Sequence, residues 1–374
     1  MEVFFEETEL RRANAGMIHP AQRESGYAVR FLKSGRLGFL ANEDPETLFQ
    51  SALEKVMRLE ECPVAPLTFP RFHDKRQTPP HYDAGLDRQP FEERVALLQD
   101  FGALEGGRYA ERVRHFHLVN TGGLDLSFKC SYFEWRHEDG RALQTRRFRD
   151  LAAAYRPPPP QSAQIKRVTL SKEFVIMAPA AAQLLATLAP RLLENATSGE
   201  WPLSNPEITL IDDGAIPHGW GTEPVDAEGS MPERTILVQD GEAVGVLADC
   251  RLAHARRARS TGNCVRENFR DEPRCGFTNL VLAPGVVSLD DYLSDPTDLS
   301  DTPTITALHG LRIEGEDVLT EARGFSTRYG ENTSAIVAEF RAPIEEILGR
   351  VLACFSDTAS TSRFIAPSLL VRSR

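Results

Sequence analysis

Four consecutive prolines near the middle of the chain constrain its folding more than any other feature. The run is Arg156-Pro157-Pro158-Pro159-Pro160. It cannot continue a helix or an inner strand, because proline lacks the backbone N–H and fixes φ. A proline run is instead stiff and extended. We therefore predict two domains, residues 1–156 and residues 165–374, joined by a Pro-rich linker at residues 157–164.

The first half of the chain predicts a sheet covered by helices. Asp44-Pro45 supplies an N-cap and a first-turn proline, and the helix that follows should turn one apolar face to the sheet. That face carries Leu48, Phe49, Ala52, Leu53, Val56 and Leu59. Apolar runs typical of strands lie at Val3–Glu7, Tyr27–Leu32, Leu37–Ala41, Val113–Val119 and Leu124–Glu134. The fold class predicted here is α+β.

The second half predicts a β-rich mixed domain. Ile208–Ile211 is a short apolar run that ends at Asp212 and Asp213. Asp240-Gly241 favours a two-residue hairpin, because both positions of such a turn need positive φ. The strands of this hairpin would be Thr235–Val238 and Val244–Leu247. Helices are predicted over Ala178–Glu194, which Pro190 should kink or divide, and over Ile344–Phe355, which carries Cys354.

Charge and composition exclude several classes of function. The 374 residues carry a formal net charge of −11, with a pI near 5.4, whereas affinity for nucleic acid comes mainly from clustered Lys and Arg. No apolar run approaches the roughly twenty residues that span a bilayer, and the acidic N-terminus is not a secretory leader. Six dispersed cysteines indicate reduced thiols. We expect a cytoplasmic protein with no nucleic-acid or membrane partner.

Five short motifs occur in one order over residues 206–285. They are IDDG at Ile211–Gly214, DAEG at Asp226–Gly229, RTILVQDG at Arg234–Gly241, STGN at Ser260–Asn263 and FTNLVLAPG at Phe277–Gly285. In this order the chain resembles the TldD/PmbA family, whose PmbA branch is also called TldE. The resemblance implies a two-domain TldD/PmbA-like fold, and a role in a peptidase system that degrades or matures unfolded peptides.

In that family the catalytic member carries zinc on an HExxxH-type helix just upstream of these motifs, with a cysteine near the C-terminus. Such a helix needs two histidines that reach one ion and a glutamate that takes a proton from the bound water. The segment Phe174–Leu193 contains no histidine. The resemblance therefore implies the TldE-like branch: a non-catalytic subunit with no cofactor of its own, paired with a zinc-bearing, TldD-like partner.

Other Cys and His residues of the chain could bind zinc or could have a purely structural role. Cys250 and His254 would share a helix face, and two cysteines follow them, so the strongest metal candidates are Cys250, His254, Cys264 and Cys275; the spacing matches no compact zinc motif. His115 and His117 would share one face of a strand, although half-buried strand histidines are common. Cys354 is a further candidate, with core packing as its alternative.

Candidate peptide contacts cluster in the same region as the motifs. Arg257 and Arg259 form a small basic patch suited to a carboxylate terminus, or else a solvated helix face. His218 lies in a Gly-rich loop. Adjacent acids on a strand point to opposite faces, so they form no acid/base pair, and Asp213 would either brace its loop or face peptide. The full set is Asp212, Asp213, His218, Arg257, Arg259, Ser260, Thr261 and Asn263.

Two alternative functions remain open beside the non-catalytic subunit. One is a stand-alone zinc peptidase with an unconventional Cys/His site. The other is a peptide-binding scaffold without peptidase activity. Zinc content of the isolated chain and association with a TldD-like chain would separate the three hypotheses.

Overall fold

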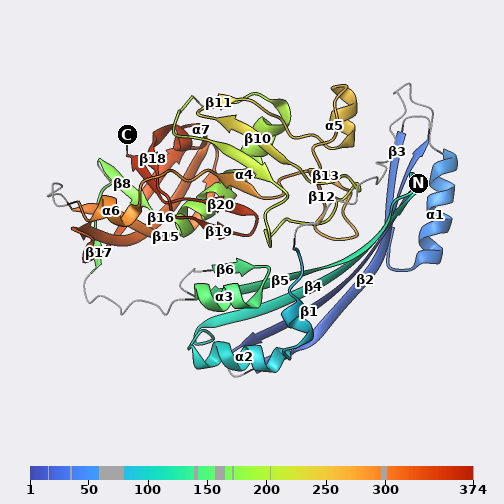
Figure 1. Cartoon of the computed structure of the whole chain (residues 1–374), viewed down its shortest axis with the longest axis horizontal. Helices are drawn as coiled ribbons and strands as arrows, with labels where there is room; N and C mark the ends of the chain where they lie inside the picture. Colours follow the sequence, from blue (N-terminus) through green and yellow to red (C-terminus); the bar gives the residue numbers. More distant parts are fainter. Residues whose placement is uncertain are drawn as a thin grey trace.

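The structure is a computed structural model that describes residues 1–15, 17–33, 36–58, 80–138, 142–155, 165–170, 172–202, 204–295 and 301–373. The predicted linker at 157–164 lies outside these residues, so the proposed domain boundaries stay a prediction. Sheets of the first half use residues 2–145, and those of the second half use residues 165–372. Figure 1 shows the first half as a curved sheet, in blue to teal, whose concave side faces the second half.

The N-terminal sheet is antiparallel, with the order β3-β2-β1-β4-β5-β6. Its strands are β1 (Glu2–Asn14), β2 (Met17–Lys33), β3 (Arg36–Asn42), β4 (Gly107–Asn120), β5 (Asp125–His137) and β6 (Ala142–Thr145). The helical elements are α1 (Pro45–Arg58), η1 (Ala84–Asp87), α2 (Phe91–Asp100) and α3 (Phe148–Ala154). The backbone N–H of Gly123 donates to the carbonyl of Asn120 at 3.2 Å, which closes the turn between β4 and β5.

Helix α1 begins where the sequence predicted, because the Asp44 carboxylate accepts a hydrogen bond from the backbone N–H of Thr47 at 2.9 Å. Leu48 and Ala52 are buried against Val29 and Phe31 of β2. The predicted apolar face was too wide, because Phe49 is 45% exposed and Leu53 is 68% exposed. The helix packs mainly on β2 and β3, and these strands cover a narrow stripe of it.

The C-terminal half contains two larger sheets, of order β11-β10-β9-β14-β20-β19 and β18-β21-β8-β15-β16-β17-β7, and the pair β12-β13. Its strands are β7 (Ile165–Arg167), β8 (Glu173–Ile176), β9 (Leu210–Asp213), β10 (Arg234–Gln239), β11 (Glu242–Ala243), β12 (Cys264–Val265), β13 (Arg274–Cys275), β14 (Leu280–Leu282), β15 (Thr302–Glu314), β16 (Asp317–Arg328), β17 (Glu331–Pro343), β18 (Val351–Cys354), β19 (Ala359–Thr361), β20 (Phe364–Ala366) and β21 (Leu369–Arg372). The predicted α+β class is confirmed.

The longest helix, α4 (Ala178–Ser198), packs against strands of both larger sheets. Its buried side chains, Leu184, Leu185 and Leu188 among them, form one core with Leu210, Leu280 and Ile305 of the sheets. Pro190 lies inside this helix without dividing it. The other helices are short: α5 (Cys250–Ala255), α6 (Leu289–Leu293), α7 (Ile344–Ile347) and η2 (Leu348–Arg350).

Two turns of the second half test local predictions. Asp240 and Gly241 have φ of +50° and +82°, which confirms the predicted hairpin turn. The second strand predicted at Val244–Leu247 was wrong, because the strand after the turn is β11 at Glu242–Ala243. The predicted helix over Ile344–Phe355 was wrong. It ends at Ile347, and Cys354 lies in β18, which pairs with β21. Apolar residues such as Val351 and Leu352 suit a buried strand as well as a helix face.

Candidate functional site

The two halves of the chain meet across an aromatic core. Phe4, Phe116 and Tyr132 of the N-terminal sheet pack with Val225 and Phe269 from loops of the C-terminal half. The Phe269 ring lies directly on β2: a Cβ added to Gly26 would come within 2.1 Å of it. Only glycine therefore fits at that position of β2, and the loop that carries Phe269 is held against the sheet.

Buried ion pairs reinforce the same interface. Arg30 of β2 forms two hydrogen bonds to the Glu2 carboxylate, at 2.8 and 2.7 Å, and a third to Glu228 at 2.9 Å. Arg30 and Glu2 are 2% and 1% exposed. The other oxygen of Glu228 accepts from the backbone N–H of Cys250 at 2.8 Å. Glu228, in the DAEG motif, thus connects the N-terminal sheet to the start of α5.

The IDDG, STGN and FTN motifs converge on the Asp212 carboxylate. It accepts hydrogen bonds from the backbone N–H of Thr278 at 2.9 Å, from the Thr278 hydroxyl and from the amide of Asn263. Asp212 and Asn263 are completely buried. Burial raises the pKa of Asp212 to about 6, against the lowering effect of these donors. The Asp212 side chain therefore joins β9 to the loops that carry Asn263 and Thr278, and it is not exposed to solvent.

Asp226 has the same role in the DAEG motif. Its carboxylate accepts from the backbone N–H groups of Glu228, Ser230 and Cys264, at 2.9, 2.8 and 3.0 Å. Burial, and then the neighbouring Glu228, raise the pKa of Asp226 to about 8, while the N–H donors oppose that rise. Together the two carboxylates shape the loops that face the N-terminal sheet.

The remaining predicted contacts are placed in separate environments. Ser260 and Thr261 both donate to the backbone carbonyl of Ala248, at 3.2 and 3.1 Å. Asp213 accepts from the backbone N–H of Ala215 at 2.9 Å, which is the loop-bracing role. Arg257 and Arg259 are exposed beyond α5. The structure does not gather these residues into one site.

His218 lines a different cleft, of about 450 Å³, together with Tyr82, Asp83 and Arg147. Its backbone N–H donates to the carbonyl of Pro80 at 2.8 Å, and its φ is +56°. Burial and the nearby Arg147 lower the pKa of this histidine. Its Nδ1 is buried without a partner among the described residues. His218 is thus partly enclosed and does not lie in an open loop.

The structure also separates the proposed metal ligands. Cys264 and Cys275 lie opposite each other on β12 and β13, whereas the Cys250 thiol contacts the Ser230 hydroxyl at 4.0 Å. Burial and Glu228 raise the pKa of Cys250, which disfavours the thiolate that binds zinc. Within the described ranges, no three His, Cys, Asp or Glu side chains are grouped for a metal.

The other three metal candidates make contacts that are common in protein structures. His115 and His117, on one face of β4, contact the Ser127 hydroxyl and the Asp125 carboxylate of β5, each at 2.8 Å. The Cys354 thiol donates to the carbonyl of Glu207 at 3.6 Å, and burial raises its pKa to about 12. These contacts match the structural alternatives given for the three residues.

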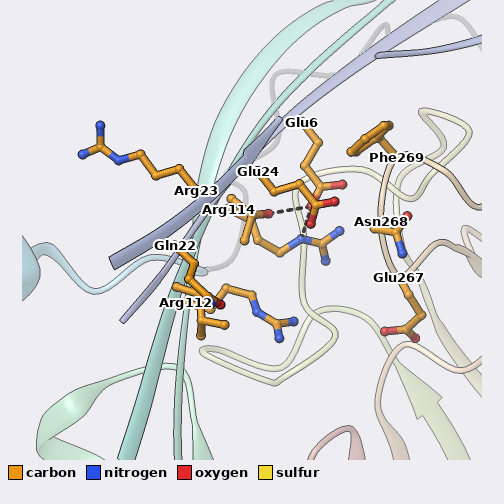
Figure 2. A pocket seen from close by; sticks show the side chains of 11 residues that line it. Glu6, Gln22, Arg23, Glu24, Arg112, Arg114, Glu267, Asn268 and Phe269 are labelled. Carbon is orange, nitrogen blue, oxygen red and sulfur yellow. Dashed lines mark hydrogen bonds and ion pairs between the residues drawn. The ribbon is translucent and has the colours of Figure 1, made fainter. Parts of the chain in front are cut away.

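A cleft at the interface has a volume of about 680 Å³ and lies between the N-terminal sheet and residues 267–269. Figure 2 shows Arg112 and Arg114 of β4 pointing into it, with Glu6 of β1 beside Arg114. Sequence reasoning missed these residues, which belong to no motif. The available pattern was the i, i+2 spacing of two arginines in a predicted strand, which places both on one face.

The raised pKa of Asp212 predicts a pH-dependent stability. Between pH 3.8 and about 6 the folded chain binds a proton on Asp212 that the unfolded chain has lost, so stability falls as pH rises through that window. Asp212→Asn removes this titration. The difference in unfolding free energy, wild type minus variant, should therefore be roughly 2 to 3 kcal/mol larger at pH 4 than at pH 7. Denaturant titrations at both pH values measure it, and a pH-independent difference would contradict the prediction.

Solved structures with this arrangement define the fold class. TldE from Thermococcus kodakarensis superposes with a TM-score of 0.77 and 18% identity, covering 99% of this chain and 95% of that one. A Thermotoga maritima protein described as a proposed modulator of DNA gyrase gives 0.75 and 18%, covering 99% and 94%. At this identity the likeness establishes a TldE-like fold alone.

Sequence comparison then supplies the family. A family model described as "PmbA/TldA metallopeptidase C-terminal domain" matches residues 176–373. Because this match covers more than half of the sequence, the chain belongs to the PmbA/TldD family. An uncharacterized protein of Methanocaldococcus jannaschii is 25% identical over 303 residues, 71% of this chain and 70% of its own. A protein named metalloprotease from Methanothermobacter thermautotrophicus is 24% identical over 324 residues, 73% and 68% of the two chains.

Proposed function

We propose that this chain is a non-catalytic, TldE-like subunit of a TldD/TldE-type metallopeptidase that cleaves or matures unfolded peptides. The main support for the proposal is the amino-acid sequence of helix α4. This helix lies where the family's zinc helix is expected, yet it contains no histidine, and its inward side chains are leucine and alanine. A catalytic zinc needs imidazole or carboxylate ligands and an open water position, so these residues do not fit the ion.

The partner in this proposal is a chain with the HExxxH helix, and its zinc would hydrolyse the peptide bond. This chain would supply part of the cavity wall and contacts to the peptide. The interface cleft supports that role, because it is polar, open and formed by both halves of the chain. A cytoplasmic location is part of the proposal and is supported by the described cysteines, which are all free thiols. Among the described residues, no helix is both long and apolar enough to cross a bilayer.

The test is to purify the chain alone and together with a TldD-like chain from the same genome. We expect no peptidase activity from the lone chain, stoichiometric association of the two chains, and chelator-sensitive cleavage of an unfolded peptide by the pair. Elemental analysis provides the control: the lone chain should contain no stoichiometric zinc. Chelator-sensitive activity of the lone chain would overturn the proposal, and zinc lost on Cys250→Ala would favour the stand-alone peptidase. Failure to associate, with peptide binding retained, would favour the scaffold.

A further inference from the structure

Three carboxylates and three guanidinium groups line the interface cleft, and one of the arginines, Arg23, pairs with Glu9, which does not line it. Each of the three acids has a cationic partner: Glu6 pairs with Arg114 at 2.7 Å, Glu267 with Arg363 at 3.5 Å, and Glu24 with Arg270. The Arg112 side chain has neither a hydrogen bond nor an ion pair to any residue in the described ranges. The charge left over in the cleft is therefore a guanidinium.

Arg114 is held in place by its contacts, but one of its N–H donor groups has no acceptor among the described residues. Its Nε donates to Glu6, and its guanidinium carbon lies 4.5 Å from the centre of the Phe116 ring. The side chain is 9% exposed, yet its Nη2 is buried without a partner in the part of the chain that the structure describes. A buried donor without an acceptor is costly. An acceptor brought by a ligand would remove that cost.

The second oxygen of Glu6, Oε2, is also buried and unpartnered among the described residues. The cleft thus presents donors from Arg112 and Arg114 next to an acceptor from Glu6. Inorganic anions carry no donor for Glu6 unless they are protonated. The last residue of a peptide carries both groups, since its carboxylate accepts hydrogen bonds and its own amide N–H donates one.

Backbone register brings these groups together. Glu6, Thr8 and Leu10 are alternate residues of β1, so they share one face of the sheet, and Arg114 and Arg112 of β4 pair with Thr8 and Leu10. Figure 2 shows both guanidinium groups directed from the sheet toward Glu267 and Asn268. A smaller cavity of about 60 Å³ continues from the cleft past Arg112, Arg114 and Arg266. That volume suits one small polar group, given about 30 Å³ for a water molecule.

Arg266 adds a second buried guanidinium, beside that of Arg114, to that cavity. Its side chain is 3% exposed and lies over the Phe4 ring at 3.9 Å, and its Nε and Nη1 have no partner among the residues that the structure describes. Burial lowers the pKa of Arg266 to about 10, with Glu2 opposing and Arg30 assisting. Arg266 therefore remains charged at neutral pH.

We propose that this cleft binds the terminal carboxylate of a peptide, with Arg112 and Arg114 donating to the carboxylate and Glu6 accepting from the terminal amide N–H. Guanidinium groups match a carboxylate with two parallel hydrogen bonds. Leu10 and Phe269 supply an apolar wall for the last side chain. The inference rests on the proposed function for its choice of a peptide as the ligand. It places the carboxylate far from Arg257 and Arg259 in the sequence, on a different surface.

The experiment measures binding of short unstructured peptides to the full chain alone, by fluorescence anisotropy with a label at the peptide N-terminus. Three peptides are used: one with a free carboxylate, the same sequence with an amidated C-terminus, and the amidated peptide with one internal residue replaced by glutamate. The third separates a terminal carboxylate from an acidic side chain. We expect the free carboxylate to bind about tenfold more tightly than either amidated form, because charge-assisted hydrogen bonds are lost on amidation.

Arg112→Gln should abolish this tenfold preference without changing the fold, because the Arg112 side chain makes no hydrogen bond or ion pair within the described ranges. Arg114→Lys, which keeps a charge for Glu6 but loses the paired donors, should also reduce it. Arg259→Gln is the matched control with the same loss of charge on an exposed residue, and it should leave the preference unchanged.

Equal binding of the free and amidated peptides, no binding of any of them, or a preference unchanged in Arg112→Gln would overturn the inference. Loss of the preference in Arg259→Gln alone would also overturn it. If the proposed function is wrong, a different experiment shows it. In that case the pair of chains shows no chelator-sensitive cleavage, whatever the outcome of the binding measurement on this chain.

Discussion

Replacing Asp212 with alanine should lower the free energy of unfolding by about 3 kcal/mol or more, because three donors lose their acceptor inside the protein. The donors are the backbone N–H and hydroxyl of Thr278 and the amide of Asn263. None of them gains access to water when the carboxylate is removed, since Asp212 and Asn263 are completely buried. Chemical denaturation followed by tryptophan fluorescence measures the change.

Asp213→Ala is the matched control for this experiment. Asp213 is adjacent in the sequence and has the same charge, but it accepts one local hydrogen bond, from Ala215, and an ion pair with Arg234 at 3.6 Å. Its removal should cost less than about 1 kcal/mol. Equal losses in the two variants would show that the Asp212 network does not stabilise the fold as described.

Replacing Arg30 with alanine should have a comparable effect, of about 3 to 5 kcal/mol. The change leaves two buried carboxylates, Glu2 and Glu228, without their main cation. Since Glu2 belongs to the N-terminal sheet and Glu228 to the C-terminal half, the variant should also loosen the interface between them. Thermal unfolding measures the stability, and hydrogen exchange at residues 226–230 measures the local effect.

Arg270→Ala is the control, because Arg270 also joins the two halves, through Glu24 and Glu43. Its side chain is 47% exposed, and solvent screens such pairs. A small change in Arg270→Ala beside a large one in Arg30→Ala would attribute the stabilisation to burial. Similar changes in both variants would contradict that attribution.

Local patterns predicted five strands of the N-terminal sheet, but they missed the long strands β15, β16 and β17 and most of the long-range architecture. The Asp240-Gly241 turn, the start of α1 after Asp44 and the turn at Asn120–Gly123 were predictable, because each depends on residues that are neighbours in the chain. The helix predicted over Ile344–Phe355 failed, because the pairing of β18 with β21 overrides the local helical pattern. Periodicity alone does not separate a short buried strand from a helix.

The candidate site could be predicted only in part. The motifs predicted peptide contacts at Asp212 and Asn263, but both side chains are completely buried. Their orientation depends on the pairing of β9 with β14, in which Asp212 lies opposite Leu280. Arg112 and Glu6 could not be found in advance, because nothing local places β4 beside β1. The polar residues of these motifs stabilise their loops through hydrogen bonds within the protein, so their presence alone does not indicate a ligand site.

The position of β1 in its sheet affects how the chain can be made. This strand lies between β2 and β4, and β4 begins only at Gly107. Because synthesis proceeds from the N-terminus, one side of β1 exposes unpaired backbone N–H and C=O groups while the intervening residues are being added. Ribosome-bound intermediates shorter than about 120 residues should therefore be the stage most prone to intermolecular strand pairing, and the stage at which a chaperone gives the greatest benefit.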